Sequence, residues 1–177
     1  IYALDRWNVR TPTSTNSTIQ QSTTAPTGFI NSALMTIGTG ASPSASDTNQ
    51  FRQYIEGLNL TDLAWGTVNA QTITLSFWVR SSVTGTFAAS LRNNGSARSY
   101  VATYTINSAN TWEQKSITIA GDQSGTWLTT SGVGINLCFD LGSGSDSNTT
   151  ANAWQSGNYT RTSGCVSLDR KSTRLNS

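Results

Sequence analysis

The sequence contains no histidine, and this absence limits the chemistry that the chain can perform. A Ser-His-Asp or Cys-His catalytic arrangement is excluded, and so is a zinc site with histidine ligands. No apolar run approaches the roughly 18 residues of a transmembrane helix. Residues 1–9 also lack the charged and then apolar pattern of a signal segment. We therefore expect no membrane insertion.

Charge and cysteine are also scarce. Charged residues make up 11% of the chain, and the basic excess is confined to one end. Residues 169–177 hold three of the eleven basic and one of the nine acidic residues, which leaves eight of each elsewhere. A nucleic-acid surface needs Lys and Arg clustered on a folded face, so we expect no nucleic-acid binding. Cys138 and Cys165 allow one disulfide at most, and free thiols are the expectation.

The longest strict alternation of apolar and polar side chains covers residues 71–82, which read Q-T-I-T-L-S-F-W-V-R-S-S. A period of two is typical of a strand with one buried face. The inward set is Ile73, Leu75, Phe77 and Val79, and the outward set includes Trp78 and Arg80. We interpret this segment as a central strand whose apolar face the rest of the chain covers.

Weaker alternation predicts further strands over residues 1–9, 31–38, 50–56, 86–92, 98–106, 112–119 and 132–141. Gly85 is expected to fold residues 86–92 back onto residues 71–82 as a hairpin. The next turn is expected at 93–95, because Asn and Gly tolerate positive φ.

Residues 11–28 and 142–164 are expected to be polar loops. One short helical turn is expected near residues 58–65, capped by Thr61 or Asp62. Short strands joined by Gly, Asn and Ser turns, without any ten-residue helical pattern, predict an all-β fold. We expect an antiparallel two-sheet β-sandwich with jelly-roll-like topology, and a closed barrel is the alternative.

Aromatic side chains outside the core suggest a sugar-binding surface, because a sugar ring presents an apolar face and a rim of hydroxyls. The candidate residues are Trp78, Arg80, Tyr54 and Arg52, which alternation places off the core face, and Trp154, Asn158 and Tyr159 in the loop 142–164. The alternatives are that another layer or subunit covers the first group, and that Trp154 pins the loop to the core.

Carboxylates are few and lie mostly at predicted turns, where Asp commonly bonds to local backbone. A glycosidase would need two of them facing each other, and we expect a non-enzyme without a resident cofactor. One loop offers oxygen ligands of the kind that calcium prefers: Asp140, Asp146 and Asn148. The alternative for this loop is ordinary solvation.

Several blocks, taken in order, resemble a family of bacteriophage tail-fibre and virion-appendage domains. They read Y-A-L-D-R-W, T-I-T-L-S-F-W-V-R-S-S-V-T-G-T-F-A, R-S-Y-V-A-T-Y-T-I, T-W-E-Q-K-S-I-T-I-A-G-D, F-D-L-G-S-G-S and A-W-Q-S-G-N-Y. The resemblance covers most of residues 1–168. It implies a β-sandwich similar to carbohydrate-binding modules, located in the virion tail or an appendage.

The same resemblance implies that the domain binds a host-surface glycan and contacts other virion subunits, with a homotrimer as one expected assembly. Two alternatives are a purely structural fibre or oligomerisation module and a module associated with a glycan depolymerase. The family gives no agreed set of ligand residues, so the candidate site residues rest on the alternation and loop arguments alone.

The end of the chain departs from the family, whose domains continue beyond the position of Leu168 through another strand. Residues 169–177, D-R-K-S-T-R-L-N-S, contain one apolar residue and no alternation. They resemble a translated sequencing adapter in an assembled environmental sequence, and a natural basic tail is the alternative. We expect a single domain over residues 1–168 that lacks its last strand, followed by a disordered, artefactual tail over 169–177.

Overall fold

In a computed structural model, which describes residues 2–4, 6–12, 16–39 and 42–168, the chain forms short strands and three turns of 3-10 helix. The strands are β1 (Tyr2–Leu4), β2 (Trp7–Arg10), β3 (Asn16–Ser22), β4 (Ser32–Thr39), β5 (Gln50–Glu56), β6 (Ile73–Val79), β7 (Gly85–Asn93), β8 (Arg98–Ile106), β9 (Glu113–Ile119), β10 (Val133–Asp140) and β11 (Trp154–Ser156). The helices are η1 (Gly57–Leu63), η2 (Asn94–Ser96) and η3 (Ser145–Ser147). The predicted all-β class is confirmed.

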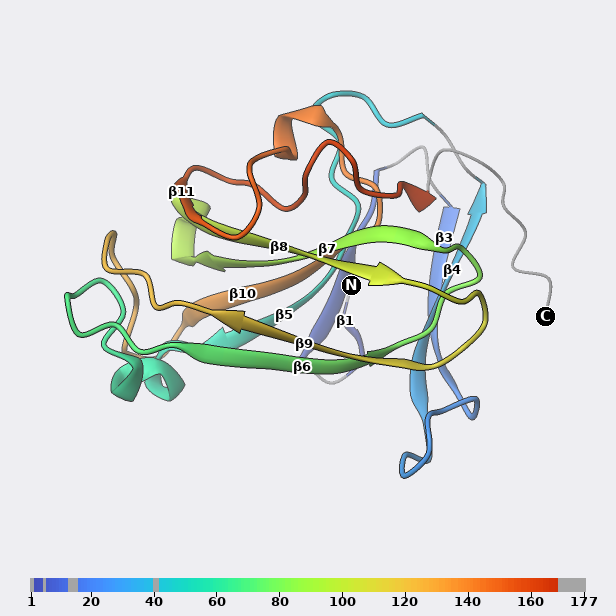
Figure 1. The fold of residues 1–177 in the computed structure, drawn as a ribbon, viewed down its shortest axis with the longest axis horizontal. Coiled ribbons are helices and arrows are strands. Elements are labelled where there is room, and N and C mark those ends of the chain that lie inside the picture. The colour runs from blue at the N-terminus through green and yellow to red at the C-terminus, as the bar shows by residue number, and fades with distance from the viewer. Residues whose placement is uncertain (1, 5, 13–15, 40–41, 169–177) are drawn as a thin grey trace.

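The strands form one large sheet and two separate pairs. The large sheet has the order β1-β2-β5-β10-β7-β8-β11, and every neighbour in it is antiparallel. The pairs β3–β4 and β6–β9 lie on its inner face (Figure 1). The second layer of the sandwich is therefore split in two within the described residues.

Alternation explains which side chains fill the space between the layers. Inward residues of β7, β8 and β10 join Ile119 of β9 and Leu60 of η1 in one buried cluster. Ile73 and Leu75 of β6 pack against this cluster from the opposite layer. Trp7 of β2 stacks on Phe51 of β5, with 4.4 Å between ring centroids.

Four predictions about individual elements were wrong. The strand at 71–82 is not central, because β6 pairs only with β9 among the described residues. Gly85 does not form a hairpin with β6, since β7 pairs with β8 and β10 in the other layer. Residues 11–28 include β3, and the helical turn has Glu56 at its N-cap, without a side-chain cap from Thr61 or Asp62.

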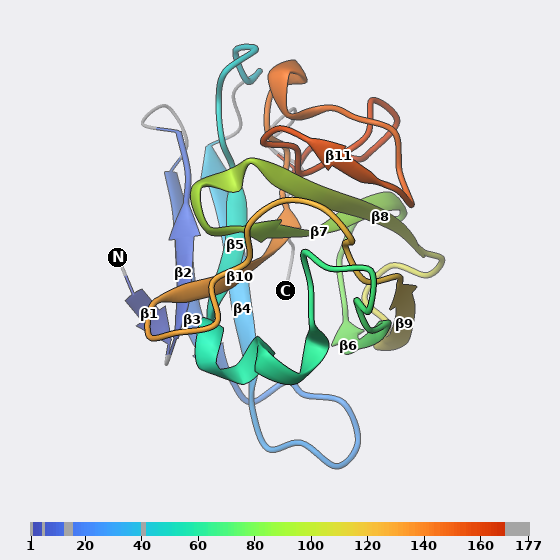
Figure 2. The ribbon, with the colours of Figure 1, turned by 90° about the vertical axis from the view of Figure 1, so that its left-hand side faces the viewer.

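The segment 142–168 covers the outer face of β7 and β8, on the side away from β6 and β9 (Figures 1 and 2). Beneath it lie small apolar side chains that alternation directs outward, including Ala88, Val101 and Cys138. Arg161 ties the segment down by donating hydrogen bonds to the carbonyl oxygens of Ser143 and Cys165, each 2.6 Å long. The long loop is thus a third layer rather than a solvated excursion.

Both cysteines are free thiols, as expected, and both are buried. Among the described residues, no helix has the length and apolar character needed to cross a bilayer. The predicted tail over 169–177 and the predicted absence of a final strand lie outside the described residues.

Candidate functional site

Trp78 stands on the outer face of the β6–β9 pair, where the sequence predicted it. Its side chain is 38% exposed, and Gln114 of β9 is its cross-strand neighbour. Arg80 donates a hydrogen bond from Nε to the carbonyl oxygen of Asn110, at 2.8 Å. This face therefore combines one indole with amide, guanidinium and hydroxyl groups, the chemistry that a sugar ring and its hydroxyls require.

Arg52 and Tyr54 lie elsewhere, on the outer face of the seven-stranded sheet. The guanidinium carbon of Arg52 is 5.2 Å from the centroid of the Tyr54 ring, within the range of a cation–π contact. Arg52 Nε donates a hydrogen bond to Oδ1 of Asn8, the neighbouring residue on β2. The four residues predicted from β5 and β6 thus belong to two separate faces.

The second face contains functional candidates that sequence reasoning missed, above all Arg92. In register across the sheet, Tyr54 lies beside Asn136, and Asn136 lies beside Arg92. Arg92 Nη1 donates to Oδ1 of Asn158 at 2.6 Å, and Nη2 donates to Oε1 of Gln50 at 3.1 Å. Alternation already directed Arg92 outward on β7, which was the available signal.

Burial lowers the pKa of Arg92, and the positive charges of Arg52 and Arg10 lower it further. Only 4% of Arg92 is exposed. Its Nε has no hydrogen-bond partner in the described chain, and neither has the buried Oδ1 of Asn136. The face therefore holds a buried cation and unused hydrogen-bonding groups.

The loop residues Trp154, Asn158 and Tyr159 do not form one binding constellation. Trp154 lies edge-on against Trp65 and Trp127, with 5.3 Å between ring centroids in each case. Its Nε1 donates to the carbonyl oxygen of Ala120 at 2.7 Å. Tyr159 packs against a buried cluster beneath the segment 142–168. The packing of this ring favours the alternative that Trp154 pins the loop to the core.

The loop predicted to hold calcium uses its acidic group differently. Asp140 is 98% buried, and its oxygens accept hydrogen bonds from the backbone nitrogens of Gly142 and Ser143. Arg161 Nη1 lies 3.4 Å from Oδ2 of Asp140. Asp146 is exposed, and Asn148 is partly buried. Donors of the chain already occupy the Asp140 carboxylate, so the geometry does not favour the calcium hypothesis.

Two further carboxylates are paired with basic side chains of the chain. Asp122 pairs with Arg98 through two hydrogen bonds of 2.7 and 2.6 Å. Glu113 pairs with Lys115 at 2.6 Å. In the described ranges, no group of three or more Asp, Glu and Cys side chains is placed to hold a metal ion.

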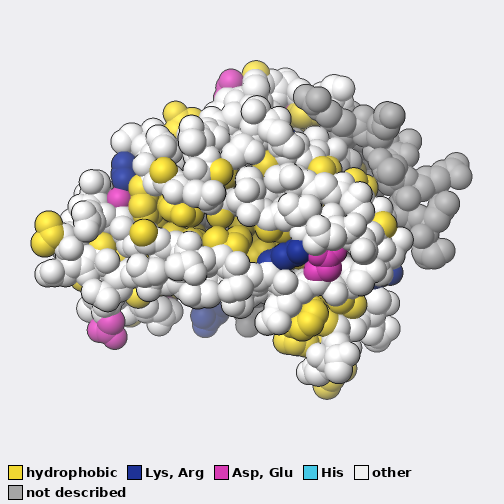
Figure 3. Space-filling model, in the orientation of Figure 1, with side chains coloured by type: hydrophobic (Ala, Val, Ile, Leu, Met, Phe, Trp, Pro, Cys, Tyr) yellow, Lys and Arg dark blue, Asp and Glu magenta, His cyan; other side chains and the backbone are white. Residues whose placement is uncertain are grey.

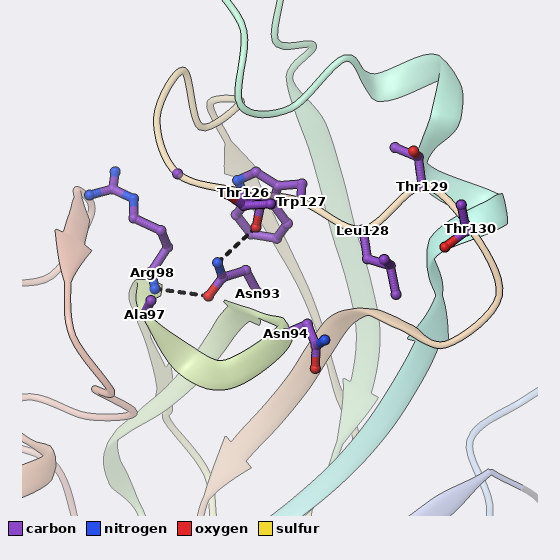
Figure 4. A pocket seen from close by; sticks show the side chains of 10 residues that line it. Asn93, Asn94, Ala97, Arg98, Thr126, Trp127, Leu128, Thr129 and Thr130 are labelled. Atoms are coloured by element: carbon purple, nitrogen blue, oxygen red, sulfur yellow. Dashed lines mark hydrogen bonds between the residues drawn. The ribbon is translucent and has the colours of Figure 1, made fainter.

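A pocket of about 450 Å³ opens beside the β7–β8 turn (Figure 4). Asn93 spans it by donating a hydrogen bond to the carbonyl oxygen of Thr126 and accepting one from the backbone nitrogen of Arg98, both 2.9 Å long. Residues 125–130, including Trp127 and Leu128, supply most of the remaining lining. Asn93 thus links the turn to the segment 125–130.

A larger groove of about 900 Å³ lies between the two pairs of the second layer. Consecutive residues of β4 and β6 form its walls, and Phe51, Leu137 and Phe139 of the large sheet are among the apolar residues that line it. Figure 3 shows hydrophobic side chains at the surface beside these strands and between the two layers. The groove is therefore an opening into the interior of the sandwich.

No protein-family model matches the sequence, and no curated protein matches it either. Among solved structures, the crystal structure of the enzymatically active domain of tailspike protein 4 from bacteriophage CBA120 is similar, with a TM-score of 0.43 and 16% sequence identity. The match covers 76% of this chain and 18% of that chain. A likeness of this degree assigns neither fold nor activity to the present chain.

Proposed function

We propose that the chain is a non-enzymatic domain of a phage tail fibre or related virion appendage that binds carbohydrate on the host surface. The exposed indole of Trp78 carries this proposal. It stands on a face of hydroxyl and amide groups. Glu113, the carboxylate of the β6–β9 pair, is paired with Lys115. The ordered sequence blocks that resemble phage appendage domains support the virion location.

Sugar stacking needs one accessible aromatic face with hydrogen-bonding groups beside it. Trp78 supplies the first, and Gln114 and Arg80 are placed to supply the second. The hydroxyls of Ser76 and Ser116 extend the polar rim and lie 3.4 Å apart across the strands. The arrangement can bind a sugar ring without any group poised to cleave it.

Replacement of Trp78 by Ala should weaken binding on a glycan array by about 1 to 3 kcal/mol, the range for one interface anchor. The matched control is Thr74→Ala, which lies on the same outer face of β6, two alternate positions away. Unchanged binding by Trp78→Ala would rule out this face as the site, and equal losses in both variants would show that the indole is not its anchor. A third variant, Phe77→Ala, should cost about 3 to 5 kcal/mol of folding stability because it removes an inward ring.

A structural role in the fibre is the second candidate, and the apolar groove favours it. Phe29 and Ile30, in the connection between β3 and β4, are 59% and 86% exposed, and Phe29 also lines the groove. Apolar surface of this kind is typical of subunit contacts. Mass measurement in solution separates the roles: a monomer that binds glycan supports the lectin, and a trimer without glycan binding supports the structural module.

A further inference from the structure

The outer face of the seven-stranded sheet has an unusual concentration of positive charge. Arg10, Arg52 and Arg92 come from three different strands, β2, β5 and β7. Among the described residues, ion pairs involve only Arg98, Lys115 and Arg161, so none of these three arginines is neutralised by a carboxylate. A cluster of like charges on one face is unfavourable by itself and is relieved by an anion.

Register brings the three cations together. Arg52 lies beside Cys138 of β10, which lies beside Ser90 of β7. The Arg92 side chain extends across the row formed by Arg52, Cys138 and Ser90. Its guanidinium donates a hydrogen bond to Gln50, which lies two positions before Arg52 on β5. Arg10 is the cross-strand neighbour of Gln50. The guanidinium of Arg92 is thus flanked by the other two basic residues.

Asp140, an acidic group on this face, is already occupied. Asp140 lies beside Gln50 in the register, but its carboxylate is bound by Arg161 and by backbone nitrogens. Arg92 instead rests on the neutral oxygens of Asn158 and Gln50. A buried guanidinium held only by amide oxygens lacks the charged partner that would offset its desolvation.

The face also has buried polar groups beneath partly exposed ones. Arg92 and Asn136 are 96% and 94% buried, and each has one polar atom without a partner in the described chain. Above them, Asn158 is exposed, and Arg52 and Tyr54 are partly exposed. The segment 142–168 covers the sheet over β7 and β8 (Figure 2). Within that segment, Asn158 contacts Arg92 through a hydrogen bond.

We propose that Arg52 and Arg92 bind the carboxylate of an acidic sugar, with Tyr54 and Asn158 against the ring that carries it. Guanidinium groups match a carboxylate through paired N–H donors. This second site lies on a different face from Trp78. This second site rests on the proposed function only in that the carboxylate belongs to a glycan. It implies that this glycan is an acidic polysaccharide.

The test measures binding of tetragalacturonic acid, its neutral methyl ester and inorganic phosphate by calorimetry and by NMR of the arginine Nε–H groups. The acid should bind and shift the Arg52 and Arg92 signals, and 0.5 M salt should weaken it through screening. The ester should bind at least tenfold more weakly. If phosphate binds the same arginines with an affinity equal to that of the acid, the ligand group is a phosphate rather than a sugar carboxylate, and the proposal is overturned.

Arg52→Gln should weaken binding of the acid roughly 10- to 100-fold, as expected for loss of a charged hydrogen bond. Arg92→Gln is the second variant, and Arg52→Gln decides alone if that variant does not fold. The matched control is Arg6→Gln, which removes the same charge from an exposed position between β1 and β2. Arg80→Gln tests the Trp78 face separately. If Arg80→Gln weakens binding of the acid and Arg52→Gln does not, the acid binds at the Trp78 face. That result overturns the site at Arg52 and Arg92 and leaves the proposed function standing. No binding of the acid, or equal binding by Arg52→Gln, also overturns it.

Discussion

At the scale of single residues, alternation determined where side chains point but not what covers them. Trp78 and Cys138 were both directed away from the core by their strands. Trp78 is exposed, whereas Cys138 is fully buried beneath the segment 142–168. Burial raises the pKa of the Cys138 thiol to about 12, so this thiol is unreactive at neutral pH. The difference depends on a distant segment, and a local pattern carries no information about it.

Gly57 shows how one missing side chain allows two segments to approach. It lies where β5 passes into η1, and it faces Gly134 of β10. A Cβ atom at position 57 would overlap the carbonyl oxygens of Leu128 and Thr130. Backbone atoms cannot move aside as a flexible side chain can, so any larger residue must push the two segments apart.

We predict that Gly57→Ala lowers the free energy of unfolding by about 1 to 3 kcal/mol, the usual cost of overpacking. Gly164→Ala is the control, because a Cβ atom there would meet nothing within 4 Å. It should change stability by under about 0.5 kcal/mol. Urea unfolding of both variants measures this, and equal effects would show that the close approach at Gly57 does not limit packing.

At the scale of elements, strand existence was easier to predict than strand pairing. The bounds predicted for β5 are those observed, and β4, β8, β9 and β10 were placed within about two residues, the ordinary disagreement at element ends. β6 and β7 are neighbours in sequence, but they lie in opposite layers. β3, with sequence N-S-T-I-Q-Q-S, was missed because its pairing with β4 rather than its propensity makes it a strand.

Prediction of the candidate site from the sequence was limited in the same way. Outward residues of single strands could be named, but Arg92 and Asn136 join Tyr54 only through the β5–β10–β7 register. That register links residues far apart in sequence, so no local signal specifies it. The packing of Trp154 also had no local signal, since its aromatic neighbours Trp65, Tyr100 and Trp127 are distant in sequence.

Glu113 organises the connection that carries the chain from β8 in one layer to β9 in the other. Its carboxylate accepts hydrogen bonds from the backbone nitrogens of Asn107 and Ser108, 2.8 and 2.9 Å long. The hydrogen bond from Lys115, followed by those from Ser108 and Asn107, lowers the pKa of Glu113 from 4.5 to about 2. A carboxylate whose pKa is lower in the folded state stabilises the fold above its unfolded pKa.

We predict that Glu113→Gln melts at a lower temperature than the parent protein at pH 7. The difference should shrink as the pH falls from about 4.5 to about 2, because protonation of Glu113 in the parent removes the same interactions. Glu56→Gln, at the exposed end of β5, is the control and should leave the melting temperature unchanged. A Glu113→Gln deficit that stays constant down to pH 2 would mean that the charge of Glu113 does not hold the turn.

At the scale of the whole molecule, the chain is built as three layers: the two strand pairs, the seven-stranded sheet, and the part of the segment 142–168 outside β11, the edge strand of that sheet. Asp140 ends β10 in the middle layer, and Arg161 belongs to the outer one. Both members of this ion pair are buried, so water cannot solvate the remaining charge when its partner is removed. This pair therefore couples attachment of the outer layer to folding of the sheet.

We predict that Arg161→Gln destabilises the protein by about 3 to 5 kcal/mol at pH 7, the cost of leaving one member of a buried pair uncompensated. Burial raises the pKa of Asp140 above 3.8, even though hydrogen bonds from Ser143 and the charge of Arg161 oppose this. Removal of Arg161 should raise that pKa further. A group with a raised folded-state pKa contributes most when protonated, so the deficit of the variant should decrease as the pH falls from 7 to 4.

Thermal and urea melts of the parent protein and Arg161→Gln between pH 4 and pH 8 measure this dependence. The double variant Asp140→Asn, Arg161→Gln is the control, because it removes both charges and retains groups of similar size. Its deficit relative to the parent should be smaller than that of Arg161→Gln at pH 7 and should not change in step with Asp140 ionisation. A deficit of Arg161→Gln that is constant with pH would instead trace the loss to the hydrogen bonds that Arg161 donates to Ser143 and Cys165. In that case the outer layer is attached by neutral acceptors, and the charge of Asp140 has no part in holding it.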